Sequence, residues 1–535
     1  MSTNSPRLMS AGTAFALFSA ATVATFHADA NEIAVVARTG TVDPRHGPNW
    51  DKRTFTSFEL TTQLSMEPSV ALVVATLGTD FGVFIIGPAS GPRMIANTAS
   101  VSQFGPQLGV TRKFRRFVST NGTTASGIAI AALADATMSG AIVGHWYYDG
   151  SIHPVAIGGQ TTGQPTCPTL AFPSEPAVSI VGSRVIGIHE CPSGPSITDG
   201  TPTGLRIAAR DGTDGQEGPG LGIGVGFLLD PGGSSEARLI PSHGGAAYYY
   251  ASTTTGLNGI WRIDTSTNLP VAVSILGPPL GPANSPDLSF QSFNQSRIAS
   301  IDSSTITFQA TLQGPGVTID NRSAIVRHKS GLNILVARAG VDGPLGPRLA
   351  GGARFYSFIA ATAVRDPEQF PIVATVSADG RDSGVWIDRG LERTLVARTL
   401  VDDQFGPQLG PDVTFQQFNQ FSMLLGGDVI VHAYVQGPGT SESNHAGIWR
   451  VSGAAPPTLL LRAGQLIDVD PDQGVSLRVV REFDATPAFG WGQVTSAQLD
   501  AAGFIFSRLL FEGGEQAVVR IRAGDQMAYS GFEQL

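Results

Sequence analysis

A short loop motif, Gly-Pro-x-Leu-Gly, returns along this chain at intervals of roughly sixty residues, and this repetition restricts the chain to folds built from similar units. Complete or partial copies begin at Gly47, Gly105, Gly218, Gly277, Gly346 and Gly406. One interval is about twice as long as most others, which predicts a degenerate copy near residue 162, at residues 158–160. Repeats of this kind bury their apolar faces against neighbouring repeats.

Strand motifs recur before each loop. An apolar segment resembling Val-Ala-Arg-Ala-Gly directly precedes the loop and is clearest at residues 36–40, 336–340, 396–399, 461–464 and 521–524. A Gly-Ile-Trp or Gly-Val-Trp segment comes before that one, beginning at Gly259, Gly384 and Gly447. The repeated arginines fit a structural link in every unit, with an anion site as the alternative: Arg38, Arg338, Arg398, Arg462 and Arg522.

A pair of phenylalanines three residues apart follows the loop in most units. The pairs are Phe55/Phe58, Phe114/Phe117, Phe290/Phe293, Phe355/Phe358 and Phe415/Phe418. Side chains alternate along a strand, so we expect this spacing to place the two rings of a pair on opposite faces. A strand that is apolar on both faces must be covered on both faces. These rings are therefore predicted to form core and not a binding surface.

Glycine and proline account for 65 and 35 of the 535 residues, which disfavours long helices and favours short strands joined by turns. Four strands in each unit, stacked against like neighbours, describe the blade of a propeller. We therefore predict an all-β chain, a β-propeller of about eight four-stranded blades, with seven as the alternative. The surplus Val-Ala-Arg strand is expected to pair the chain ends and close the ring. Two packed β-sandwiches are the competing architecture.

The repeat unit resembles that of bacterial tandem-repeat proteins defined by an Asn-x-x-Gly-x-x-x-x-Ala-Phe pattern, a Gly-(Val/Ile)-Trp strand and an Ala-Arg-x-Gly-Asp segment. Residues 500–506 and 522–525 carry the first and last elements best, and most copies lack the Asn-x-x-Gly portion. The resemblance implies an exported, propeller-like repeat protein whose function is uncharacterised. It implies no catalytic residues.

The N-terminus predicts export. Residues 1–30 read as a signal peptide, with an uncharged stretch from Leu8 to Phe26 and an Ala-x-Ala site at residues 28–30, although an uncleaved anchor is the alternative. The mature chain, residues 31–535, is then one propeller domain with no membrane span, located outside the cell, on its surface or in the periplasm. We expect it to be a monomer.

The chain has two cysteines, Cys167 and Cys191. They lie in a Pro/Ser-rich stretch at about 163–203 that we interpret as an insertion in the repeat array. In an oxidising compartment we expect them to form a disulfide, with two buried free thiols as the alternative.

The net charge and the absence of certain motifs argue against several classes of function. The net charge of -9 argues against nucleic-acid binding, which needs a basic surface. Nine histidines form no metal-spaced pair, and neither a nucleophile elbow nor a phosphate loop is present. Alternating carboxylates at Asp468, Asp470 and Asp472 have a spacing that calcium ligands adopt, so calcium is a possible cofactor, and a solvated loop is the alternative.

A specific site is expected where the repeats differ. The candidates are the Cys-containing stretch, the run Tyr248, Tyr249 and Tyr250, and the aromatic run around Trp146 and Tyr147 that extends to Tyr148. Exposed Tyr and Trp are common in binding faces, and burial in the core is the alternative. The favoured function is an exported, non-enzymatic binding or surface module for a glycan or protein. The alternative is a carbohydrate-active glycosidase or lyase, which needs convergent carboxylates.

Overall fold

The computed structural model describes residues 33–60, 71–87, 91–123, 127–135, 141–164, 167–172, 178–229, 237–240, 246–263, 267–300, 304–361, 369–377, 379–390, 392–423, 427–453, 455–470, 474–483, 498–499 and 504–522. The predicted signal peptide, residues 1–30, lies outside these residues. The described part of the chain contains no helix with the length and hydrophobicity needed to cross a bilayer.

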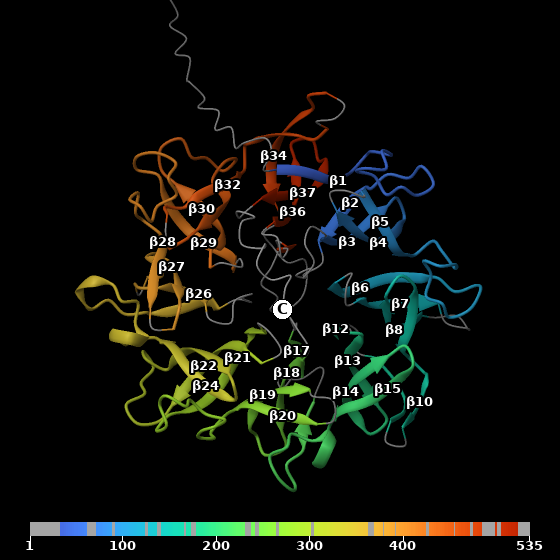
Figure 1. Ribbon diagram of the computed structural model, residues 1–535, viewed down its shortest axis with the longest axis horizontal. Coiled ribbons are helices and arrows are strands. Elements are labelled where there is room, and N and C mark those ends of the chain that lie inside the picture. Colours follow the sequence, from blue (N-terminus) through green and yellow to red (C-terminus); the bar gives the residue numbers. More distant parts are fainter. Residues whose placement is uncertain are drawn as a thin grey trace, which may run out of the picture.

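Eight antiparallel sheets form a ring, and the chain passes once around it (Figure 1). Blade 1 contains β2 (Ser57–Leu60), β3 (Ala71–Leu77), β4 (Asp80–Gly87) and β5 (Gly91–Asn97), and blade 2 contains β6 (Phe114–Thr123), β7 (Gly127–Asp135), β8 (Ala141–Tyr148) and β9 (Ile152–Ile157). Blade 3 contains β12 (Val178–Val181), β13 (Arg184–Cys191), β14 (Gly194–Thr201) and β15 (Gly204–Arg210). Blade 4 contains β16 (Phe227–Leu228), β17 (Arg238–Ile240), β18 (Ala247–Thr253), β19 (Asn258–Ile263) and β20 (Asn268–Val273).

Blades 5 to 8 continue the ring. Blade 5 contains β21 (Ser289–Ser300), β22 (Ile306–Gln313), β23 (Ser323–Lys329) and β24 (Leu332–Arg338), and blade 6 contains β25 (Ser357–Ala361), β26 (Phe370–Thr375), β27 (Ser383–Asp388) and β28 (Arg393–Arg398). Blade 7 contains β29 (Thr414–Met423), β30 (Val429–Gln436), β31 (Ala446–Val451) and β32 (Thr458–Arg462). Blade 8 contains β33 (Leu466–Asp468), β34 (Leu477–Phe483), β35 (Gln498–Leu499), β36 (Phe504–Phe511), β37 (Gln516–Arg522) and β1 (Ile33–Arg38). Three single-turn 3-10 helices lie in loops: η1 (Gly215–Glu217), η2 (Gly343–Leu345) and η3 (Ala350–Gly352).

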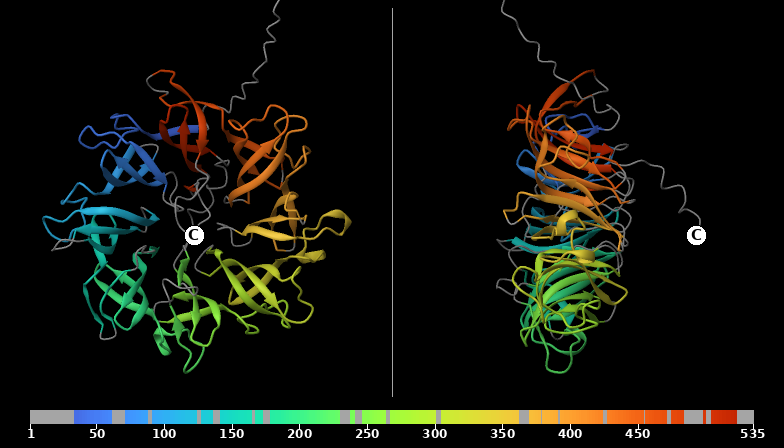
Figure 2. Two further views of the ribbon diagram at one scale, coloured as in Figure 1. Left: turned by 180° about the vertical axis from the view of Figure 1, so that it is seen from behind. Right: turned by 90° about the vertical axis from the view of Figure 1, so that its left-hand side faces the viewer.

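The first strand of the chain closes the ring. β1 pairs antiparallel with β37, so the blue N-terminal strand lies beside the red C-terminal blade in both face-on views (Figures 1 and 2). The predicted eight-bladed, all-β propeller and the pairing of the chain ends are confirmed, and the seven-bladed and β-sandwich alternatives are wrong. In blade 8, β37 is followed outward by β1, which is the outermost strand.

The phenylalanine pairs do not point to opposite faces, which corrects the sequence prediction. The ring centroids of Phe415 and Phe418 lie 5.1 Å apart, and the other four pairs show separations of 4.8 to 5.3 Å. The pairing register shifts between Phe415 and Gln417, and equivalent bulges lie inside the pairs that begin at Phe114 and Phe290. One extra residue in the strand reverses the alternation, so both rings enter the same core.

Tryptophan side chains bind three of the repeated loops to their blades. Trp261 is fully buried, packs edge-on against Phe227 and donates its indole N–H to the carbonyl oxygen of Pro219, 2.9 Å away. Trp146 and Trp449 donate in the same way to the prolines of their own Gly-Pro loops. In these three blades the proline carbonyl of the repeated loop satisfies the hydrogen-bond donor of a buried indole.

The Val-Ala-Arg strands carry a bulge in all eight blades. In β20, for example, Val271 is skipped between the pairs formed by Ala272 and Pro270. Polar side chains of the following blade bind the skipped carbonyl groups: Asn268 reaches Ala208, Asn333 reaches Val271, and Arg393 reaches Val336. Adjacent blades are thus joined by hydrogen bonds to backbone groups that the sheets leave unpaired.

The repeated arginines mostly bind hairpins within their own blade. Arg338 donates to the backbone oxygen of Asn321 at 2.7 Å, Arg462 donates to that of Asn444 at 2.6 Å, and Arg398 pairs with Asp382. These contacts join the outermost strand to the hairpin between the second and third strands. They support the structural interpretation of the arginines.

Most of the stretch at 163–203 is a regular part of the ring. It supplies β12, β13 and β14, so the part added to the repeat is the small hairpin of β10 (Thr161–Gln164) and β11 (Cys167–Thr169). The predicted disulfide between Cys167 and Cys191 is present and fastens β11 to the end of β13.

Candidate binding pocket between the first two blades

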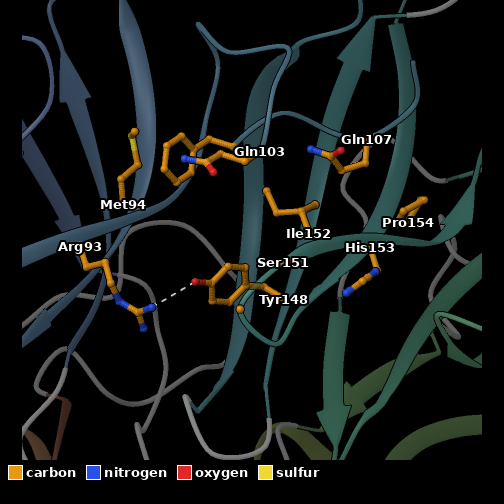
Figure 3. Close-up of a pocket in the computed structure, with 11 residues that line it drawn as sticks. Arg93, Met94, Gln103, Gln107, Tyr148, Ser151, Ile152, His153 and Pro154 are labelled. Atoms are coloured by element: carbon orange, nitrogen blue, oxygen red, sulfur yellow. Dashed lines mark hydrogen bonds between the residues drawn. The ribbon is translucent and has the colours of Figure 1, made fainter. Parts of the chain in front are cut away.

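A pocket of about 620 Å³ lies between blade 1 and blade 2. Arg93 and Met94 of β5 form one side, and the loop between β5 and β6 contributes Gln103, Phe104 and Gln107. The opposite side is Tyr148 and residues 150–154 of the β8–β9 hairpin (Figure 3). The volume is within the range of pockets that hold small ligands.

The loop side is held rigidly by its own backbone and by one glutamine. The amide of Asn97 donates to the backbone oxygen of Phe104 at 3.0 Å, and the amide of Gly105 donates to that of Ser102. Gln107 has a φ of 55° and donates its side-chain amide to the same Ser102 oxygen at 2.6 Å. These hydrogen bonds hold the loop in the conformation in which Gln103 and Phe104 line the pocket.

Arg93 and Tyr148 face each other across the boundary between the blades. The Arg93 guanidinium donates to the Tyr148 hydroxyl oxygen at 3.2 Å, as the dashed line in Figure 3 shows. The Arg93 side chain is exposed and Tyr148 is half-buried. This contact places a positive charge and a phenol at one side of the pocket.

The hairpin side carries a second polar contact. A ring nitrogen of His153 lies 3.1 Å from a carboxylate oxygen of Asp149. The preceding residue, Ile152, is buried and belongs to the apolar cluster that blades 1 and 2 share. The positions equivalent to Ile152 in blades 4, 5 and 6 are Asn268, Asn333 and Arg393, whose polar side chains form hydrogen bonds to the loop before their blade. The apolar side chain of Ile152 cannot form such hydrogen bonds.

The chain contains a second copy of the loop that lines this pocket. Residues 103–109 and 404–410 have the identical sequence Gln-Phe-Gly-Pro-Gln-Leu-Gly. Gln408 donates to the oxygen of Asp403 at 2.6 Å, as Gln107 does to that of Ser102. The strands around the copy differ, because strand pairing places Thr394 where blade 1 has Arg93 and Val451 where blade 2 has Tyr148.

The pocket has a positive character. Arg93 is the one Lys or Arg among the described residues that line it, and none of those residues is an Asp or Glu. His153 adds an imidazole whose nearest carboxylate, Asp149, lies outside the lining. The set of side chains, an arginine, a phenol, two glutamines and an aromatic ring, is suited to bind a polar ligand and to stack against its flat face.

The three tyrosines predicted as a binding face are buried in β18. Tyr248, Tyr249 and Tyr250 are 1%, 0% and 5% exposed, and Tyr249 stacks on Trp261 with ring centroids 6.0 Å apart. Burial raises the pKa of Tyr249 well above its usual value. These residues pack in the blade core, so they offer no exposed face to a ligand.

The other predicted aromatic site lies beside the pocket without lining it. Trp146 is fully buried and Tyr147 is 6% exposed, but the next residue, Tyr148, faces the pocket. The aromatic run thus belongs to the hairpin that lines the pocket, and the residue that faces the pocket is the one after Tyr147. Arg93 was missed, since no motif surrounds it. The repeated loop sequence was noticed only as a turn.

The predicted calcium loop is held by protein groups where the structure describes it. A carboxylate oxygen of Asp468 accepts from the amides of Asp470 and Ser476, at 3.1 and 3.0 Å. Asp470 pairs with Arg38 of β1, and Asp472 lies outside the described residues. Among the described residues no three His, Cys, Asp or Glu side chains gather as metal ligands would.

Two histidines are buried together between blades 2 and 3. The rings of His145 and His189 lie 4.8 Å apart, Phe172 packs edge-on against both, and none of the four ring nitrogens has a hydrogen-bond partner in the part of the chain that the structure describes. A Cβ on Gly187 would lie 2.1 Å from His145, so glycine is needed there to admit the ring. Burial lowers the pKa of His145 to about 3 and lowers that of His189 strongly.

The fold and this site define an eight-bladed β-propeller with a polar pocket between its first two blades. The chain belongs to the DUF7453 family, a family of unknown function, whose model matches residues 197–511. No curated protein matches it by sequence. The comparisons do not confirm the resemblance to the Asn-x-x-Gly-x-x-x-x-Ala-Phe repeat proteins.

Several solved structures are similar to this chain. Dipeptidyl peptidase 4 of Porphyromonas gingivalis is 9% identical, with 89% of this chain and 60% of that chain covered and a TM-score of 0.40. The β-propeller domain of the trilobed protease from Pyrococcus furiosus is 8% identical, with 76% and 98% covered and a TM-score of 0.33. An oligogalacturonate lyase in complex with manganese is 7% identical, with 86% and 99% covered and a TM-score of 0.35. We draw no functional argument from these likenesses.

Proposed function

We propose that this protein is an exported, non-enzymatic binding module that holds a saccharide in the pocket between its first and second blades. The observation that carries the proposal is the pocket itself, which combines the Phe104 and Tyr148 rings with the side-chain amide of Gln103 and the side-chain oxygen of Gln107, whose N–H groups hold the loop. Aromatic rings pack against the apolar faces of sugars, and amides serve the hydroxyl groups as donors and acceptors.

Rigidity of the pocket supports binding. The loop side is held by backbone hydrogen bonds, and the hairpin side belongs to a regular sheet in the core of blade 2. A ligand that enters a preformed pocket loses less free energy to the ordering of side chains and loops than one that must fold its site. Export is supported by the disulfide between Cys167 and Cys191, a bond typical of oxidising compartments.

The alternative function, a glycosidase, would require a pair of carboxylates roughly 5–10 Å apart on either side of the scissile bond. The described residues that line this pocket include no carboxylate. This composition favours binding over two-carboxylate hydrolysis at this place.

A glycan array and calorimetry on the purified protein, with analysis of products, test the proposal. We expect saccharide binding without released fragments. Gln103→Ala should weaken binding by about fivefold, since one neutral hydrogen bond is lost. The matched control is Gln404→Ala in the second copy of the loop, which should leave binding unchanged. Release of fragments, or equal loss in both variants, would reject the proposal.

A further inference from the structure

We infer that the saccharide bound between the first two blades is a sugar acid, whose carboxylate binds Arg93 and Tyr148. This inference rests on the proposed function and adds the chemical class of the ligand. Its starting point is the charge of Arg93, for which no carboxylate partner exists among the described residues.

Two other arginines of the first two blades are paired with carboxylates. Arg115 on β6 lies 2.7 Å from Asp135, and Arg53 before β2 pairs with Asp80. Among the described residues, the hydrogen-bond partner of the Arg93 guanidinium is instead the neutral hydroxyl of Tyr148, at 3.2 Å. A guanidinium presents a planar fork of donors that matches a carboxylate, so an anionic group that enters the pocket gains a partner without displacing one.

Tyr148 supplies the second donor. Its hydroxyl oxygen accepts the hydrogen bond from Arg93, which leaves its O–H free to donate elsewhere. One oxygen of a carboxylate can therefore accept from the guanidinium while the other accepts from the phenol. The rest of the ligand then extends toward Gln103 and Phe104 on the loop side of the pocket.

The donor set favours a carboxylate over a phosphate. A phosphate group carries a charge of about -1.5 to -2 at neutral pH and has three strong acceptor oxygens. The described lining offers one permanent positive charge, that of Arg93. A single charge and a planar fork match a singly charged, planar group.

The second copy of the loop shows that the loop sequence does not by itself supply the arginine and the tyrosine. Residues 404–410 repeat residues 103–109, but Thr394 and Val451 replace the arginine and the tyrosine. The boundary between blades 6 and 7 is therefore not expected to bind the anion, although it carries the same loop. The boundary between blades 1 and 2 is the place where the repeats differ.

The test compares glucuronate, galacturonate and mannuronate with glucose, galactose and mannose, and with glucose 6-phosphate, by calorimetry on the purified protein. We expect at least one uronate to bind at least tenfold more tightly than its parent hexose and more tightly than the phosphate. Arg93→Gln should remove that difference, and Tyr148→Phe should reduce it about threefold to tenfold. Arg381→Gln, at a side chain that is 81% exposed in blade 6, makes the same change in net charge and should have no effect.

Each outcome separates the two claims. Equal binding of a uronate and its parent hexose, or tighter binding of the phosphate, overturns the sugar-acid inference and leaves saccharide binding intact. A preference for uronates that survives Arg93→Gln also overturns the inference. Failure of every sugar to bind the wild-type protein, while its thermal melting shows it folded, rejects both claims.

Discussion

Asn333 at the start of one outermost strand donates its side-chain amide to the backbone oxygen of Val271 in the preceding blade, 2.9 Å away. The same amide lies 3.2 Å from the oxygens of Pro279 and Leu280, and the side-chain oxygen of Asn333 meets His328 at 3.0 Å. One buried side chain therefore serves the bulge of β20, the following loop and its own blade. Propellers need such contacts because each blade is stable only against its neighbours.

Asn333→Ala should lower the free energy of unfolding by about 1–3 kcal/mol, since buried carbonyl groups lose their donor. Urea denaturation measures the change. Leu332→Ala, at a neighbouring side chain that is 46% exposed, is the control and should change stability much less. An equal effect of the two substitutions would show that the hydrogen bonds to the preceding blade add nothing.

The tryptophans give a comparison within one chain. The indole N–H of Trp261 donates to Pro219, whereas that of Trp386 has no acceptor among the described residues. Both rings are buried, and each packs on an equivalent phenylalanine. Trp→Phe removes a similar volume at both positions. We expect the loss of stability to be larger at position 261 by about 1 kcal/mol, the usual value of one hydrogen bond. Thermal melts of W261F and W386F test this, and equal losses would contradict it.

The buried histidines predict sensitivity to acid. Burial holds the pKa of His145 at about 3 and that of His432 at about 4, below the ordinary value of 6.5, and also lowers that of His189. Below pH 6.5 the unfolded chain binds protons that the folded chain does not, so stability is complete above this pH and falls as pH decreases toward the folded-state pKa values. Each such histidine contributes a slope of about 1.4 kcal/mol per pH unit.

Urea denaturation between pH 7.5 and 4.5 measures this slope. His189→Phe keeps a ring against Phe172 and removes one titrating group, so it should flatten the dependence on pH. His153→Asn, at a partly exposed histidine, is the control and should preserve it. A slope that is unchanged in H189F would refute the assignment.

The disulfide predicts a local effect of reduction. Cys167 and Cys191 close a loop with a sequence separation of 24, and a loop of this size contributes about 3 kcal/mol in the chain-entropy model. Reduction, or the double substitution of both cysteines by Ala, should lower thermal stability. It should also increase amide hydrogen exchange in the β10–β11 hairpin before the rest of the ring. Loss of protection in all blades together would contradict this expectation.

The repeat architecture was predictable because its causes are local and occur several times. Gly-Pro turns, paired phenylalanines and a strand surplus at one end are visible in the sequence, and they predicted four-stranded blades and the pairing of β1 with β37. The disulfide was predictable from the number of cysteines and the predicted export. The direction of the Phe418 ring was not, because a bulge changes the alternation by one residue without changing the residue types.

The candidate pocket could not be predicted from the sequence in this way. Tyr248 of β18 and Tyr148 of β8 both lie in aromatic runs on strands inside a blade. Tyr248 is nevertheless buried, whereas Tyr148 faces a pocket. Which of them is exposed depends on how the neighbouring blade packs. That packing is a property of the assembled ring.

The sequence by itself determined that similar sixty-residue units, apolar on both faces, would stack side by side. The tertiary structure alone decided that Arg93 of one blade meets Tyr148 of the next across a pocket. The physical reason is that strand alternation and turn chemistry act over a few residues, whereas the approach of residues 55 positions apart follows from the angle at which two blades pack.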